Sequence, residues 1–264
     1  MRGLISTLVV LVATACTAES EPLEPGCDAP LLSTRLAPEN TNKLDLLFMI
    51  DTSADMSSEQ AVFAQALPDF VRELTAASSI SANDIHVGFI TADLGTGGHL
   101  IPTCEEPVFG DDALLHLTTL APCGDLIAPS DVPFLSFRED SNSEELSADM
   151  MCLTNGNDDG CGIEQPLDAI LKALTPTSSP LRFADESTGH GSVTNDGFLR
   201  PGAVLAVILL ANEDDCSIRD AELFDRNSLV YTEPDLSARC LLYEDGLHPI
   251  QRYVDGLLAL RTPE

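Results

Sequence analysis

LDLLFMIDTSAD, residues 44–55, is the stretch that decides the fold. Apart from Asp45, the residues that precede Asp51 are apolar, and a short apolar run of this kind is typical of a strand buried on both faces of a parallel sheet. Residues 57–77 then carry apolar side chains at helical spacing. Pro68 lies inside that segment and predicts a kink or a break. The sequence therefore predicts a buried strand that leads directly into a helix.

Short apolar runs and helical patterns alternate along the rest of the chain. Residues 85–91 and 203–210 (AVLAVILL) predict two further strands. Further helices are predicted over 164–174, near 219–228 and over about 248–260. Residues 99–150 show no regular period and predict a long, disulfide-bearing insertion with short strands. This order of elements predicts an α/β fold with a doubly wound, Rossmann-like, mostly parallel sheet.

The predicted domain covers residues 44–264, which is enough chain for one substantial hydrophobic core. A doubly wound sheet usually continues with more strands after a helix such as 248–260. This chain stops at Glu264 instead. We therefore expect a sheet that is either truncated at its C-terminal side or unusually small.

The N-terminus carries the pattern of an export signal. Arg2 precedes an apolar run that ends at Val12, and small residues then lead to Cys16. The run is too short for a membrane helix, which needs about 20 apolar residues. Residues 17–43 are rich in Pro, Glu, Ser and Thr and predict a flexible tether. Residues 1–16 are thus expected to be a signal peptide and lipobox, and the mature protein is expected outside the cytoplasm.

The sequence around Cys16 resembles a bacterial lipobox, in which the cysteine is lipidated and becomes the mature N-terminus. Thr17, rather than Asp, follows the cysteine. In such lipoproteins this favours the outer membrane or cell surface over retention in the inner membrane. Plain secretion, or a periplasmic location, is the alternative.

The chain is strongly acidic, with a formal net charge of -30 from 43 acidic and 13 basic residues. This balance disfavours binding to nucleic acid and adsorption to anionic lipid headgroups, so we expect membrane contact through the lipid anchor only. Most of the carboxylates must belong to a solvated surface, because one cation site needs only a few of them. The absence of Trp disfavours a carbohydrate-stacking platform.

The chain has eight cysteines, which in an oxidising compartment should mostly pair. Local spacing suggests the following pairs: Cys104–Cys123, Cys152–Cys161 and Cys216–Cys240. Connectivity cannot be deduced from sequence alone. With Cys16 lipidated, Cys27 would be left over in the tether.

Polar clusters follow two of the predicted strands. Residues 51–55 follow the first strand and residues 212–215 follow the apolar run 203–210. In a doubly wound sheet, ligands bind outside the carboxyl ends of the strands, where loops converge. Carboxylate, hydroxyl and amide oxygens suit a hard divalent cation, Mg²⁺ or Ca²⁺.

Residues 46–56 resemble the start of a von Willebrand factor A (VWA) domain, in which a strand ends in an Asp-x-Ser-x-Ser metal-ion-dependent adhesion site. Three other segments resemble VWA-like bacterial surface lipoproteins: residues 160–167, 197–200 and 212–217. The resemblance covers roughly residues 44–260. It implies a VWA-type sheet and a protein ligand that is bound through a divalent cation.

By this resemblance, Asp51 and Ser53 match the first two metal-linked positions, and Asp55 stands where the family has its second Ser. Asn212 stands where a later Asp is expected, and Glu164 lies nearest to the position of the family's loop Thr. The family's loop Thr has no clear equivalent, and the resemblance implies that Asp214 or Asp215 substitutes for the ligand that is missing. The alternative from the residues alone is that Asp51 and Ser53 only cap the helix that follows.

Three hypotheses follow. The first is a surface-anchored, non-enzymatic VWA-like binding or adhesion lipoprotein that engages a protein ligand through a divalent cation. The second is a metal-free structural or assembly lipoprotein of the cell envelope. The third is a secreted hydrolase that uses an acidic pair, although with 43 acidic residues such pairs arise by chance.

Overall fold

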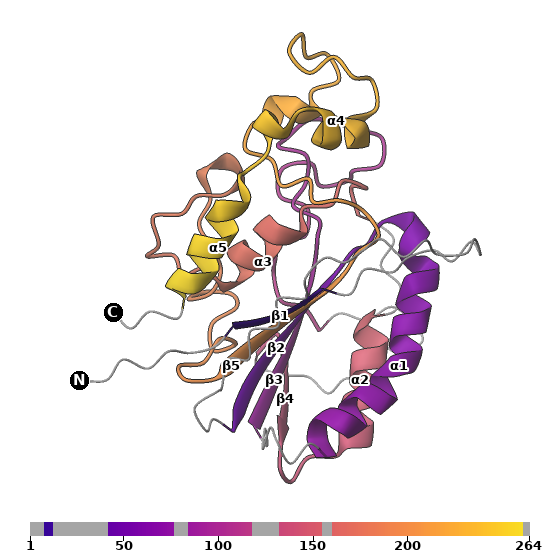
Figure 1. Ribbon diagram of the computed structural model, residues 1–264, viewed down its shortest axis with the longest axis vertical. Coiled ribbons are helices and arrows are strands. Elements are labelled where there is room, and N and C mark those ends of the chain that lie inside the picture. Colours follow the sequence, from indigo (N-terminus) through magenta and orange to yellow (C-terminus); the bar gives the residue numbers. More distant parts are fainter. Residues whose placement is uncertain (1–7, 13–41, 77–83, 118–131, 155–159, 261–264) are drawn as a thin grey trace, which may run out of the picture.

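The computed structural model describes residues 8–12, 42–76, 84–117, 132–154 and 160–260. These residues form an α/β fold in which helices cover a mostly parallel, open sheet (Figure 1). The predicted α/β class and mostly parallel sheet are confirmed, and the arrangement is compatible with a Rossmann-like fold.

The strands are β1 Leu8–Val12, β2 Lys43–Ile50, β3 Asp84–Thr91, β4 Leu135–Arg138 and β5 Val204–Leu210. The helices are α1 Ser57–Ala76, α2 Ser143–Thr154, α3 Pro166–Leu174, α4 Leu236–Leu242 and α5 Ile250–Ala259. Single 3₁₀ turns lie at Ala54–Met56, Ala184–Glu186, Ala221–Phe224 and Glu244–Gly246. The described helices include none that is long and apolar enough to cross a bilayer.

The sheet order is β1-β5-β2-β3-β4, with β2 in the centre. Strand β2 pairs in parallel with both β3 and β5, and β4 is antiparallel to β3. Phe48 stands opposite Phe89 on one side and Ile208 on the other, and the two phenylalanine rings stack with 5.0 Å between their centroids. The three strands predicted from apolar runs thus lie side by side.

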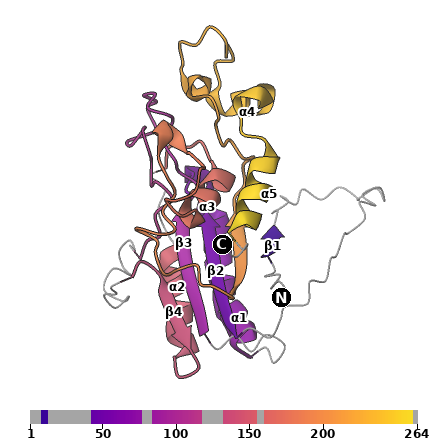
Figure 2. The same ribbon diagram turned by 90° about the vertical axis from the view of Figure 1, so that its left-hand side faces the viewer.

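Strand β1 pairs in parallel with β5 at the edge of the sheet (Figure 2). Its residues belong to the predicted signal peptide, which processing would remove. We therefore expect the mature sheet to be β5-β2-β3-β4. Cys16, Cys27 and nearly all of the predicted tether lie outside the described residues.

Alternation along β2 divides the core between the two faces of the sheet. Leu46 and Phe48 pack with residues of α1 and α2 on one face. Leu47 and Met49 pack with residues of α3 on the other, where α5 also lies (Figures 1 and 2). Because successive strand residues point to opposite faces, a run that is apolar at nearly every position is buried on both.

The helices differ from the prediction in three respects. Helix α1 continues through Pro68, so the proline does not break it. Helices α2 and α4 were not predicted, and α2 lies partly in the acidic part of the segment predicted to be loop. The helix predicted near 219–228 is only the 3₁₀ turn Ala221–Phe224.

Of the three predicted disulfides, one is confirmed and two are wrong. Cys216–Cys240 is present as predicted. Cys104 pairs with Cys161, which makes both Cys104–Cys123 and Cys152–Cys161 wrong. The prediction failed because it used local spacing, whereas the fold brings together residues 57 apart in sequence. Cys152 is also disulfide-bonded, and Cys123 lies outside the described residues.

Candidate functional site

Asp51 stands immediately after β2, at the carboxyl edge of the sheet. Its backbone N–H donates to the Leu210 carbonyl at 2.8 Å, which joins the ends of β2 and β5. Its Oδ1 accepts the Ser53 N–H at 2.8 Å, and the Ser53 hydroxyl donates to Asp55 Oδ1 at 2.8 Å. The Asp51 side chain is completely buried, yet Oδ2 has no hydrogen-bond partner among the residues that the structure describes.

Glu164 comes to the same edge from a distant part of the chain. Its carbonyl accepts the Cys216 N–H at 2.8 Å, and the neighbouring Gln165 N–H donates to Ala92 just beyond β3 at 2.9 Å. These bonds hold the segment before α3 between the ends of β3 and β5. The Glu164 side chain is 1% exposed, and within the described residues neither of its carboxyl oxygens has a hydrogen-bond partner. We call these two atoms and Asp51 Oδ2 the orphaned oxygens.

The electrostatics of this edge are unfavourable for a carboxylate. Burial, followed by repulsion from Asp51 and Asp93, raises the pKa of Glu164 to about 9. Burial also raises the pKa of Asp51, and donors on Ser53 and Asn212 offset this only in part. The pKa of Glu213 is raised by burial and by the charges of Asp51 and Asp55. A bound cation would lower each of these raised pKa values.

The orphaned oxygens allow a direct test of whether these residues fit a divalent cation. Buried carboxyl oxygens without donors are costly, and a cation would satisfy them. Within the described segments, however, no three His, Cys, Asp or Glu side chains lie close enough together to share an ion. A cation here would thus need hydroxyl and water ligands as well as carboxylates. Mg²⁺ commonly binds through one or two carboxylates and keeps several waters, so the donor set fits Mg²⁺ better than a Ca²⁺ cage.

The remaining predicted residues divide between this edge and other roles. Asn212 is exposed and lines a groove of about 430 Å³ together with Glu164, Glu213 and Asp214. The Asp215 carboxylate accepts the N–H groups of Leu167 and Ser217 and the Ser217 hydroxyl. It therefore fixes the start of α3.

Two residues at this edge were missed as candidates. Glu213 lies inside the polar cluster 212–215, but the resemblance to the VWA pattern points to Asn212 and gives Glu213 no role. Thr52 lay inside the motif itself; its hydroxyl is buried and has no partner in the described part of the chain. Gly160 lies so close that a Cβ there would be 2.6 Å from the Thr52 hydroxyl oxygen.

Helix α4 forms the opposite wall of the groove. Asp235, Ser237, Ala238 and Leu241 line that wall. The disulfide Cys216–Cys240 joins α4 to the loop that follows β5. The Asp235 side chain accepts the N–H groups of Ser237 and Ala238 and caps the helix. The groove is therefore held open beside Glu164 by a covalent bond and a capped helix.

No family model and no curated protein matches this chain in comparisons with known proteins. The assignment of this edge of the sheet as a functional site consequently depends on the residues and the geometry described above.

Proposed function

We propose that this chain is a VWA-like binding module of the cell surface, anchored through a lipid on Cys16, which engages a protein ligand through a divalent cation. Asp51, Ser53, Asp55 and Glu164 would hold the cation, and the Asn212 side chain would supply an oxygen from the rim. The observation that carries the proposal is the set of orphaned oxygens at the carboxyl edge of β2.

The position of these oxygens supports binding. In open α/β sheets, ligands bind outside the carboxyl ends of the strands, and both Asp51 and Glu164 lie there. A cation would supply the positive charge that two buried carboxyl groups lack, and the protein's own hydroxyl groups and water would complete its coordination. The pattern of donors favours Mg²⁺ over Ca²⁺.

The adjoining groove supports a macromolecular ligand. It opens beside Glu164 and is bounded by α4, whose Leu241 is 62% exposed. A ligand in this groove would contact the cation site and an apolar wall at the same time. The proposal assigns the site to binding and gives it no catalytic step.

A metal-free structural or assembly lipoprotein is the second candidate, and one observation favours it. The bonds from Ser53 N–H to Asp51 and from the Ser53 hydroxyl to Asp55 close the turn before α1 without any ion. In that case the polar motif would serve only to start the helix.

Calorimetric titration of the full chain with Mg²⁺, Ca²⁺ and Mn²⁺ separates the two candidates. We expect saturable binding by the wild type, with Mg²⁺ preferred, and loss of binding in Asp51→Ala and Ser53→Ala. Asp69→Asn is the matched control, because Asp69 is an exposed acid on α1. A wild type that binds none of these cations would leave the metal-free candidate.

A further inference from the structure

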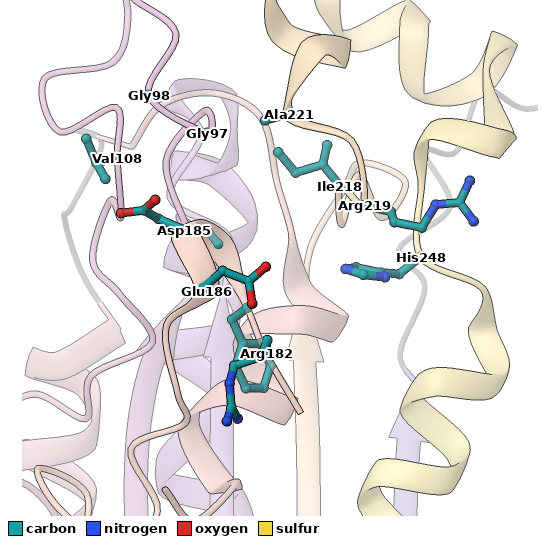
Figure 3. A pocket seen from close by; sticks show the side chains of 12 residues that line it. Gly97, Gly98, Val108, Arg182, Asp185, Glu186, Ile218, Arg219, Ala221 and His248 are labelled. Carbon is teal, nitrogen blue, oxygen red and sulfur yellow. The ribbon is translucent and has the colours of Figure 1, made fainter. Parts of the chain in front are cut away.

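A second pocket, of about 740 Å³, lies away from the groove and shares no lining residue with it. Four segments that are distant in sequence form its walls (Figure 3). They supply Gly97, Gly98 and Val108 after β3, residues 182–186 after α3, Ile218, Arg219 and Ala221 after β5, and His248 before α5. Its volume is within the range of small-ligand sites, which is about 300–1,000 Å³.

The charged groups of this pocket do not all face its interior. Glu186 and His248 point toward each other across the space, whereas the guanidinium groups of Arg182 and Arg219 point away (Figure 3). Arg182 donates to the carbonyls of Ser179 and Leu181, and Arg219 donates to the carbonyl of Asp245. The space between the walls therefore presents a carboxylate and an imidazole.

Glu186 is held in place by the backbone. Its φ is 56°, and Asp185 before it has φ 52°, a left-handed conformation that side-chain-bearing residues rarely adopt. The loop is closed by the Phe183 N–H, which donates to the Ser187 carbonyl at 3.0 Å. The carboxylates of Asp185 and Glu186 form neither a hydrogen bond nor an ion pair in the described part of the chain. The pocket therefore carries the exposed carboxylate of Glu186, whose Cα–Cβ direction is set by the backbone and which pairs with no described side chain.

His248 faces Glu186 as a neutral ring. Burial and the charges of Arg252 and Arg219 lower its pKa to about 4, so at neutral pH the imidazole has a nitrogen free to accept a hydrogen bond. Its backbone N–H donates to the Ser217 carbonyl at 3.0 Å, which fixes the start of the segment before α5. The apolar walls beside it come from Ile218 and Ala221.

We propose that this pocket binds a primary alkylammonium group, the chemistry that a free diamine shares with a lysine side chain. Glu186 is the counter-ion, His248 accepts one of the ammonium N–H bonds, and Val108, Ile218 and Ala221 cover the methylene groups. The net charge of -30 also favours the approach of cations from a distance.

Titration of the full chain with two probes tests the proposal and separates the two sources of the ligand. The probes are cadaverine and a short neutral peptide that contains one lysine, and the same peptide with acetylated lysine is the uncharged control. We expect saturable binding of at least one probe and none of the acetylated peptide. Binding of cadaverine alone identifies a free amine, and tighter binding of the peptide identifies a protein lysine. Absence of binding by both probes would overturn the proposal.

Variants locate the binding in this pocket. Glu186→Gln keeps the shape of the side chain and should weaken binding at least about tenfold, since a charge-assisted hydrogen bond is lost. His248→Phe should weaken it less. Glu73→Gln, an exposed acid on α1, should leave the affinity unchanged. Equal affinity in Glu186→Gln and the wild type would contradict the proposal.

Glu186→Gly distinguishes a binding role from a structural one. Glycine adopts left-handed φ without strain, so this variant should unfold at a higher temperature than the wild type while it loses the amine. A Glu186→Gly protein that retains wild-type affinity for the probe would show that Glu186 does not hold the ligand.

Discussion

Asp45 and Asp51 are two aspartates of the same segment, and their surroundings are opposite. Both side chains are completely buried, and burial raises the pKa of both. Arg200 supplies its countercharge to Asp45, since its backbone N–H and Nε each donate at 2.7 Å. Asp51 keeps Oδ2 without a partner in the described residues and has Glu164 nearby instead. The fold therefore pairs Asp45 with a positively charged side chain. Asp51, at the carboxyl edge of the sheet, has no such side chain in the part of the chain that the structure describes, and a bound cation can supply the positive charge there.

The largest effect should come from breaking the satisfied pair. Arg200→Met leaves Asp45 buried and without its countercharge, and removal of one partner of a buried pair costs about 3–5 kcal/mol of unfolding free energy. The double variant Asp45→Leu, Arg200→Met should recover most of this loss. Urea denaturation measures both.

Arg72→Met is the control for this comparison. Arg72 pairs with Asp69 on the surface of α1, with side chains that are 63% and 76% exposed. Exposed pairs contribute about 1 kcal/mol or less. If Arg200→Met were no more costly than Arg72→Met, the contrast between Asp45 and Asp51 would have no energetic basis.

Supplying the missing cation should have the next largest effect. At a Mg²⁺ concentration of about a hundred times the dissociation constant, linkage predicts about 2.7 kcal/mol of added stability for the wild type. Asp51→Asn should gain almost none of it, whereas the Arg72→Met control should gain all of it. Thermal unfolding with and without Mg²⁺ measures the difference, and an equal gain in Asp51→Asn would exclude Asp51 as a ligand.

The pH dependence of stability should reveal Glu164. Its pKa is raised to about 9 from 4.5. A raised carboxyl pKa stabilises the fold fully below the unfolded value, and this contribution is lost as pH rises through the folded value. The metal-free wild type should therefore lose stability between about pH 4.5 and 9, and Glu164→Gln should lose less. At the upper end of this range the variant should be the more stable by about 1–3 kcal/mol. Parallel pH profiles would contradict the assignment.

The position of Asp51 could be predicted from sequence, because the signal for it lies in neighbouring residues. Asp51, Ser53 and Asp55 follow a strand whose apolar run is unmistakable, so their place at the edge of a parallel sheet could be predicted. Asp45 looked like an interruption of that run, because its partner Arg200 is 155 residues away. Pairing over such a distance has no local signal.

The errors have the same physical origin. Cys104–Cys161 joins residues 57 apart in sequence, and a contact over that distance has no local signal. Helix α2 was missed for a different reason. Its buried Leu146, Met150 and Leu153 are at helical spacing, but the helix begins inside the polar, acidic stretch 139–145, which carries no apolar period.

The smallest effect should come from Thr52, whose orphaned hydroxyl lies beside Asp51. Thr52→Val removes a buried polar group that has no hydrogen-bond partner within the described residues, so the metal-free protein should gain up to about 1 kcal/mol. Thr175 is the matched control, because its hydroxyl is equally buried and unpartnered within the described ranges but follows α3. Thr175→Val should give a similar gain. Only Thr52→Val should weaken Mg²⁺ binding, if the Thr52 hydroxyl belongs to the cation site. Equal Mg²⁺ affinity in both variants would exclude the Thr52 hydroxyl and leave Asp51, Ser53, Asp55, Glu164 and Asn212 as the proposed ligands.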